Sequence, residues 1–214
     1  MRLRITKNGI SIPSFKLTPA DIEQQVLSDL SRFNKGWFSK YRQTPQSPLD
    51  VDSFIKLLWG IDVIYDNLPQ LNDEEVLGCF EPTQQQIIID AGACNNPRRI
   101  SFTVAHEAGH LSLHSFLFAY KDGKVTGWKN GISSVNKNLE HQADLYAASL
   151  LSPQQEIYDF LSTKGLLLGN GVIYPIDLLV HAVSFQERFG LSRQALEIRL
   201  RQLNLPVINK KYPD

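Results

Sequence analysis

Apolar residues follow two kinds of spacing along the chain, and each kind predicts a different element. Helical spacing begins after Thr18-Pro19, which have the residue types of an N-cap and a first helical residue, and continues to about Phe33. The same spacing predicts helices over residues 50–59, 99–120, 139–151 and, with a break at Gly190, 176–203.

Strand-like patterns are confined to the middle of the chain. One is the run IDVIY, which starts at Ile61; the other is EVLGCFEPTQQQIIIDAG, in which two strands would meet at a turn at Glu81-Pro82-Thr83. Because Ile87-Ile88-Ile89 is continuous and β-branched, we expect that strand to be buried on both faces. Residues 121–138, rich in Gly, Asn, Ser and Lys, predict a long exposed loop. Helices around a small sheet indicate the α+β class.

Composition excludes several classes of protein. The 214 residues are 43% hydrophobic and 21% charged, which is typical of a globular domain and excludes disordered, collagen-like and coiled-coil chains. The two cysteines, Cys79 and Cys94, are too few for a disulfide framework. The sequence contains no apolar stretch of membrane-spanning length, and its basic start is followed by no apolar signal region. We therefore expect a soluble cytoplasmic protein with no membrane partner.

The formal net charge of zero hides an uneven distribution. Residues 1–42 carry eight basic and three acidic side chains, whereas residues 43–90 carry one basic and nine acidic. The basic part ends in RFNKGWFSKYR, Arg32 to Arg42, where four cations interleave with four aromatics. Such a run can bind nucleic acid by phosphate contacts and stacking, but one short run is weak evidence. We favour a surface helix end whose aromatic side chains pack inward.

The segment His106-Glu107-Ala108-Gly109-His110 carries the chemistry. Two histidines four residues apart project from one helix face, so both imidazoles can reach one metal ion. Glu107 lies beside the first histidine, where it can accept a proton from water. This is the HExxH pattern of zinc hydrolases.

A catalytic zinc ion takes three protein ligands and keeps one position open. We favour Glu140 as the third ligand, because a second helix antiparallel to the first can turn it toward the histidines. Asp144, one turn further on, could accept the free ring N–H of a ligand histidine without touching the metal itself. His114 lies two turns from His106, so we interpret it as a histidine that packs in the core or contacts a metal ligand rather than the metal. Cys94 could offer a thiolate, but we interpret it as a small core residue.

Residues 99–114 and 140–153 resemble the two central motifs of the ImmA/IrrE family of metallopeptidases. That family typically reads RFTLAHELGHLLLH and then ExxAxxFAAxLLMP, and this chain departs mildly from it at Tyr146 and Ser152. The resemblance covers roughly residues 20–205. It implies a compact gluzincin-like metallopeptidase domain with a small mixed sheet and an HExxH helix.

The resemblance also implies roles for individual residues. His106, His110 and Glu140 would bind zinc, and Glu107 would act as the general base. The position of Asp144 varies in the family, so its role rests on helix spacing alone. The implied activity is limited proteolysis of a regulatory protein, often a DNA-binding repressor.

Two features of the substrate site stay open at this stage. The donor that stabilises the oxyanion could be Tyr120, Tyr146, His141 or His181. A substrate could add as an extra strand to residues 85–90, if that strand lies at the edge of the cleft.

Residues 183–197 resemble a helix-turn-helix, with Ser184 and Glu187 as a capping box, Gly190 at the turn and Ser192 as the next N-cap. The second helix is expected to expose three arginines that could meet phosphates, namely Arg193, Arg199 and Arg201. Gln186 stands where such units usually have a small residue. A structural or partner-docking role is therefore favoured over DNA reading.

These observations predict four segments. They are a basic N-terminal helical segment (1–42), a metallopeptidase core (43–175), a helix-turn-helix-like segment packed on the core (176–205) and a tail (206–214). The predicted function is that of a zinc-dependent endopeptidase acting on a regulatory protein. The alternative is a regulator that keeps the metal site but binds DNA or a repressor without cleaving it.

Overall fold

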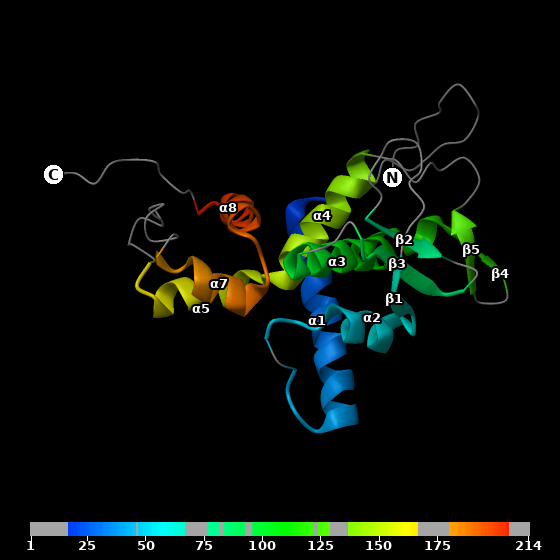
Figure 1. The fold of residues 1–214 in the computed structure, drawn as a ribbon, viewed down its shortest axis with the longest axis horizontal. Helices are drawn as coiled ribbons and strands as arrows, with labels where there is room; N and C mark the ends of the chain where they lie inside the picture. Colours follow the sequence, from blue (N-terminus) through cyan, green and yellow to red (C-terminus); the bar gives the residue numbers. More distant parts are fainter. Residues whose placement is uncertain are drawn as a thin grey trace.

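The computed structural model describes residues 17–45, 47–66, 77–81, 84–92, 96–121, 124–128, 137–166 and 180–205. In this part of the chain, helices accompany a three-stranded sheet and a separate two-stranded one, so the predicted α+β class is confirmed. In Figure 1, α3 and α4 lie at the centre, with the strands on one side and α5, α7 and α8 on the other.

The first helix, α1 (Pro19–Tyr41), begins with a capping box. The Asp21 backbone N–H donates to the Thr18 hydroxyl, and the Asp21 carboxylate accepts from the Thr18 backbone N–H at 2.8 Å. The helix continues past Phe33, where the sequence predicted its end. Two more aromatic rings follow on the same face: the ring centroids of Phe33 and Trp37 lie 5.4 Å apart, and those of Trp37 and Tyr41 lie 4.4 Å apart. The basic aromatic run is therefore the C-terminal part of α1.

The three-stranded sheet follows α2 (Val51–Trp59), which begins at the N-cap Asp50 and ends at Gly60 with φ 72°. Its strands are β1 (Asp62–Asp66), β2 (Gly78–Glu81) and β3 (Gln86–Asp90), in the order β1-β3-β2. β3 is parallel to β1 and antiparallel to β2. Ile87 and Ile89 are fully buried but Ile88 is only partly so, which makes the prediction of burial on both faces wrong for that residue.

Helix α3 (Pro97–His114) starts at the N-cap Asn96 and is shorter than predicted. A 3-10 turn (Ser115–Leu117) follows, and then a hairpin of β4 (Phe118–Lys121) and β5 (Lys124–Trp128). The aromatic residues Phe116, Phe118 and Tyr120 alternate with smaller ones, which is a strand period rather than a helical one. β5 lies within residues 121–138, so part of the predicted long loop is a strand.

The remaining helices are α4 (Lys137–Leu151), α5 (Gln154–Thr163), α7 (Ala182–Phe189) and α8 (Arg193–Gln202). Gly190 ends α7 with φ 66°, and the Ser192 hydroxyl caps α8 by accepting from the Ala195 backbone N–H, as predicted. Ser184 lies inside α7 and caps nothing, so the capping box predicted there is wrong.

Arg199 of α8 is buried, contrary to the prediction that it faces solvent. Its guanidinium donates to both oxygens of Glu23, at 2.7 and 2.9 Å, and to the Ser152 carbonyl at 3.1 Å. These bonds tie α8 to α1 and to the end of α4. Arg193 and Arg201 are exposed, and both pair with Glu197. No helix in the described ranges combines the length and apolar character that a membrane crossing needs.

Candidate metal centre

The HExxH segment lies in the middle of α3, which is buried on most sides. Val104, Ala105, Ala108 and Leu111 pack into the core. This packing fixes the rotation of the helix, so that His106, whose side chain is 18% exposed, faces the open side.

Gly109 lets α4 approach α3 closely. A Cβ atom built on Gly109 would lie 3.0 Å from the Cα and 3.1 Å from the carbonyl oxygen of Ala143, both backbone atoms of α4. Glu140 and Asp144 flank Ala143 on that helix. The close contact of the two backbones therefore places both carboxylates beside the histidines of α3.

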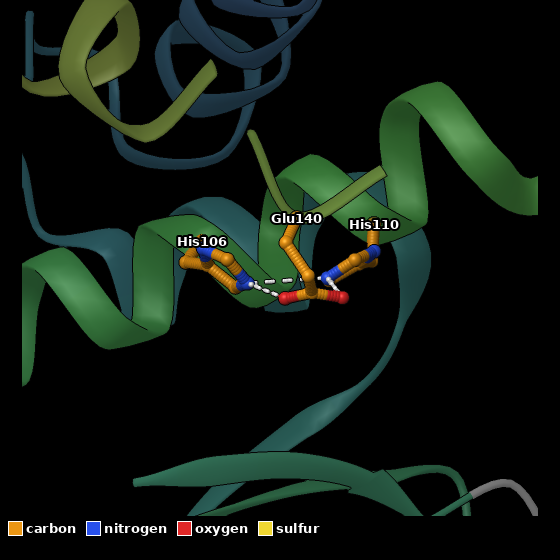
Figure 2. Close-up of side chains that lie close together, drawn as sticks. All are labelled: His106, His110 and Glu140. Carbon is orange, nitrogen blue, oxygen red and sulfur yellow. Dashed lines mark hydrogen bonds and ion pairs between the residues drawn. The ribbon is translucent and has the colours of Figure 1, made fainter. Parts of the chain in front are cut away.

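Three side chains from the two helices converge on one point (Figure 2). The Nε2 atoms of His106 and His110 lie 3.1 Å apart. The Glu140 carboxylate places one oxygen 3.1 Å from His106 Nε2 and the other 3.4 Å from His110 Nε2. Ligands about 2.0 Å from a tetrahedral zinc ion are about 3.3 Å apart. The three donor groups thus fit zinc in both chemistry and spacing, with a fourth position left open.

Hydrogen bonds orient both histidines. Asp144 Oδ1 lies 2.9 Å from His106 Nδ1, and a carboxylate only accepts, so Nδ1–H donates and Nε2 is the nitrogen that faces the cluster. His114 donates from Nε2 to Gln142 Oε1 at 3.1 Å, which leaves its Nδ1 to accept from His110 Nδ1–H at 3.0 Å. Burial lowers the pKa of His114 to about 4, which keeps that ring neutral. Both histidines therefore use Nδ1 in a hydrogen bond and turn Nε2 toward the same point.

Without a metal ion, the cluster holds a proton. Burial disfavours the charged form of His106, but hydrogen bonds to Asp144 and Glu140 outweigh it and raise the pKa of His106 to about 10. Burial likewise opposes ionisation of Glu140, yet its contacts with His106 and His110 lower its pKa to about 2. A divalent cation entering the cluster would take the place of that proton.

Glu107 is 9% exposed and borders the cleft beside the donor cluster. Burial raises the pKa of its carboxyl group, and the imidazoles of His110 and His106 partly offset this. A carboxylate with a raised pKa is a better proton acceptor near neutral pH.

The cleft at this point has a volume of about 350 Å³ and is bounded by α3, α4 and the start of β2. A Cβ atom on Gly78 would lie 2.9 Å from the Thr103 side chain and 3.4 Å from Glu107 Oε1. Leu77 and Gly78, at the start of β2, line the cleft, whereas β3 lies between β1 and β2 among the described strands. The prediction that residues 85–90 form the edge of the cleft is therefore wrong, and β2 takes that place.

The structure removes three of the four side chains considered as oxyanion donors. Tyr146 is fully buried, and its hydroxyl donates to Asp29 at 2.8 Å. His141 and His181 are not among the described residues that line the cleft. The side chain of Tyr120, like residue Cys94, lies outside the described part of the chain.

Sequence reasoning missed two residues that support the centre. Gln142, which orients His114, is a buried polar side chain among apolar residues of α4, and that pattern was its only signal. Asp29 of α1 is buried and accepts from Tyr146, Ser112 and Arg32, so it ties α1 to both helices of the centre. Ser112 and Tyr146 lie far from Asp29 in the sequence, so spacing could not reveal this link.

A known protein family and a solved structure are similar to this chain. A family profile described as Peptidase_M78, the IrrE N-terminal-like domain, matches residues 59–201, about two thirds of the chain. A search of curated proteins found no significant match. Among solved structures, a Mycobacterium tuberculosis transcriptional regulator is similar over 92% of this chain, with 17% identity and a TM-score of 0.49. This chain spans about half of that protein, 54% of its length. The resemblance to the ImmA/IrrE family is confirmed, and the chain belongs to the M78 peptidase family of IrrE N-terminal-like domains.

Proposed function

We propose that the protein is a zinc-dependent endopeptidase that makes a limited cut in a regulatory protein, and that this substrate is a DNA-binding repressor. His106, His110 and Glu140 hold the zinc ion in this proposal, with Asp144 behind His106. The observation that carries it is the buried Glu107 carboxylate beside three donor groups at tetrahedral spacing. A site that only binds a metal ion has no need of that carboxylate.

The chemistry divides between the metal and the chain. Zinc, when bound, supplies a Lewis acid that lowers the pKa of water to about 7 and polarises a peptide carbonyl. Glu107 accepts the proton of the attacking water and passes it to the leaving amine, so one residue serves as base and then as acid. Asp144 and His114 accept the Nδ1 protons of His106 and His110, so that each ring would offer Nε2 to the metal ion.

The substrate would bind as an extended segment along β2. Leu77 and Gly78, at the start of this strand, line the cleft, where an extended segment could lie beside them. Gly78 brings the strand close to Glu107, because any side chain there would meet Thr103. A narrow cleft that accepts one extended segment suits limited proteolysis of a selected protein. Membership of a family that is generally metal-dependent supports the same proposal.

Comparing the native chain with Glu107→Gln tests the proposal. Protein N-termini are labelled in cells that carry each form, and new N-termini are identified by mass spectrometry. We expect one or a few new N-termini, from a DNA-binding regulator, with the native chain and none with Glu107→Gln. Equal zinc content in both forms is the control. If cells with the two forms contain the same protein N-termini and show the same change in gene expression, the chain acts by binding without cleavage.

A further inference from the structure

The C-terminal end of α1 carries aromatic side chains that face solvent. The sequence predicted that the aromatic residues of this run pack inward, and Phe33 does so, at 1% exposed. Phe38 and Tyr41, however, are 52% and 44% exposed. In Figure 1 this end of α1 extends away from α3 and α4 at the lower edge of the molecule. Neighbouring exposed aromatic rings are typical of a surface that binds another molecule.

Positively charged side chains lie next to both rings. Residues three and four apart are neighbours on a helix, so Lys35 lies beside Phe38, as does Arg42 at the end of the helix. The Lys40 ammonium group lies 5.0 Å from the centre of the Tyr41 ring. All three cations are exposed, and none of them forms an ion pair within the described part of the chain.

The same stretch of chain has no acid that could offset these cations. From residue 30 to residue 49 there are four basic side chains and no Asp or Glu. The next acid, Asp50, caps α2 by accepting from Ser53. Glu156 of α5 lies nearby, but it is paired with Arg188 of α7 at 2.8 Å. A positively charged surface with exposed rings is complementary to a polyanion that also offers flat apolar groups.

A pocket adjoins Phe38 at this end of the helix. It has a volume of about 360 Å³, and Asn34, Phe38 and Thr44 are among the residues that line it. Ligand pockets generally measure about 300–1,000 Å³, so there is room for one planar base. An aromatic ring beside an amide and a hydroxyl group suits a base, which stacks through its face and forms hydrogen bonds through its edge.

We propose that this surface, which comprises Lys35, Phe38, Lys40, Tyr41 and Arg42 with the adjoining pocket, binds single-stranded nucleic acid. Bases would stack on the two rings while the cations contact the phosphates between them. In a duplex the faces of the bases are covered by the neighbouring pairs, so the rings should select an unpaired strand. Single-stranded DNA and RNA share this chemistry.

The surface lies apart from the metal centre. Leu150 lines the pocket, and it is about 15 Å from Glu140 along the axis of α4. No described residue lines both this pocket and the cleft. A bound strand would therefore leave the zinc ligands and the cleft free, which makes this inference independent of the proposed peptidase function.

Fluorescence anisotropy with the full chain tests the proposal. The probes are dye-labelled oligo-dT and oligo-U strands of about 12 nucleotides and a DNA duplex of the same length. We expect a Kd of about 1–100 μM for at least one of the strands at about 50 mM salt, and about tenfold weaker binding of the duplex. With three phosphate contacts, the affinity should fall about 20-fold between about 50 and 200 mM salt. The ratio of the two strand affinities shows whether the surface serves DNA or RNA.

Two substitutions separate stacking from charge. Phe38→Ala should weaken strand binding about tenfold, because it removes the ring on which one base stacks. Lys35→Glu should weaken binding by a similar factor and also reduce its dependence on salt. Leu27→Ala and Lys164→Glu are the matched controls, because both side chains are exposed and neither lines the pocket. Both controls should bind like the native chain, and circular dichroism checks that every variant folds.

Four results would overturn the proposal. They are a Kd above about 1 mM for both strands, binding of the duplex as tight as that of either strand, native affinity in Phe38→Ala, and displacement of the strand by an equal concentration of a Glu/Leu peptide. The third result would mean that the surface attracts any polyanion, and the fourth that it serves a protein partner. Zinc content and new N-termini test the peptidase function separately.

Discussion

Replacing His114 by phenylalanine is expected to weaken zinc binding without touching a ligand. His114 is 1% exposed, and its ring accepts from His110 Nδ1–H while donating to Gln142. Phenylalanine keeps an aromatic ring at this position, but it has no ring nitrogen that could donate or accept a hydrogen bond. The His110 proton then has no acceptor, and it can move to Nε2, the atom that should bind the metal.

The size of the effect follows from these contacts. Loss of an outer hydrogen-bond partner typically reduces metal affinity by about 10–100-fold, which is about 1.4–2.7 kcal/mol. A buried N–H left without a partner also costs about 1–3 kcal/mol of folding free energy. Both the zinc affinity and the free energy of unfolding should therefore fall by comparable amounts.

A competition titration against a fluorescent chelator measures the zinc affinity of His114→Phe, and urea unfolding measures its stability. Gln142→Glu keeps an acceptor for His114 and should bind zinc at least as tightly as the native chain. His141→Ala, an exposed histidine next to Glu140, is the control and should change nothing. Native zinc affinity in a folded His114→Phe protein would refute the reasoning.

Three further predictions concern the packing and titration of the centre. Gly109→Ala should lower the unfolding free energy by about 1–3 kcal/mol and weaken zinc binding, because the added methyl group pushes α4 and Glu140 away; urea unfolding and zinc titration measure both. Asp29→Ala should cost about 3 kcal/mol of stability, since it leaves Tyr146 and its other buried donors without an acceptor. Because the pKa of His106 is raised to about 10, zinc binding at neutral pH should release about one proton. The zinc association constant should then rise about tenfold per pH unit, and calorimetry in buffers of different ionisation enthalpy counts the proton.

A specific result would contradict each of these predictions. Unchanged zinc affinity in Gly109→Ala would mean that α4 can shift without moving Glu140. A native unfolding midpoint in Asp29→Ala would mean that the buried carboxylate is not a link between helices. A zinc-binding enthalpy that does not change with the ionisation enthalpy of the buffer would mean that no proton is released and that His106 is already unprotonated.

Local spacing explains which parts of the centre could be predicted from sequence. His106 and His110 are one helical turn apart, and so are Glu140 and Asp144, so each pair could be placed on its own helix face. That the two pairs meet depends on Gly109 touching the backbone of α4, which is a tertiary contact. The resemblance to the ImmA/IrrE family, rather than the spacing, supported the prediction that the two pairs meet.

The errors have the same physical origin. The positive charge of Arg199 predicted exposure, but its partner Glu23 lies on a helix at the other end of the chain. The sequence does not show which strands β3 pairs with, so it places residues 85–90 rather than β2 at the edge of the cleft. Helix α3 ends at His114 because the following residues pair as a hairpin, and this pairing overrides the helical pattern.

Zinc content per chain tests the central claim most directly. Elemental analysis of the purified full chain, with Glu140→Ala and Glu107→Gln beside it, gives the stoichiometry. The account predicts one zinc per chain in the native protein and in Glu107→Gln, and little or none in Glu140→Ala. A native chain that takes up no zinc, or a Glu140→Ala variant that keeps a full equivalent, would contradict it.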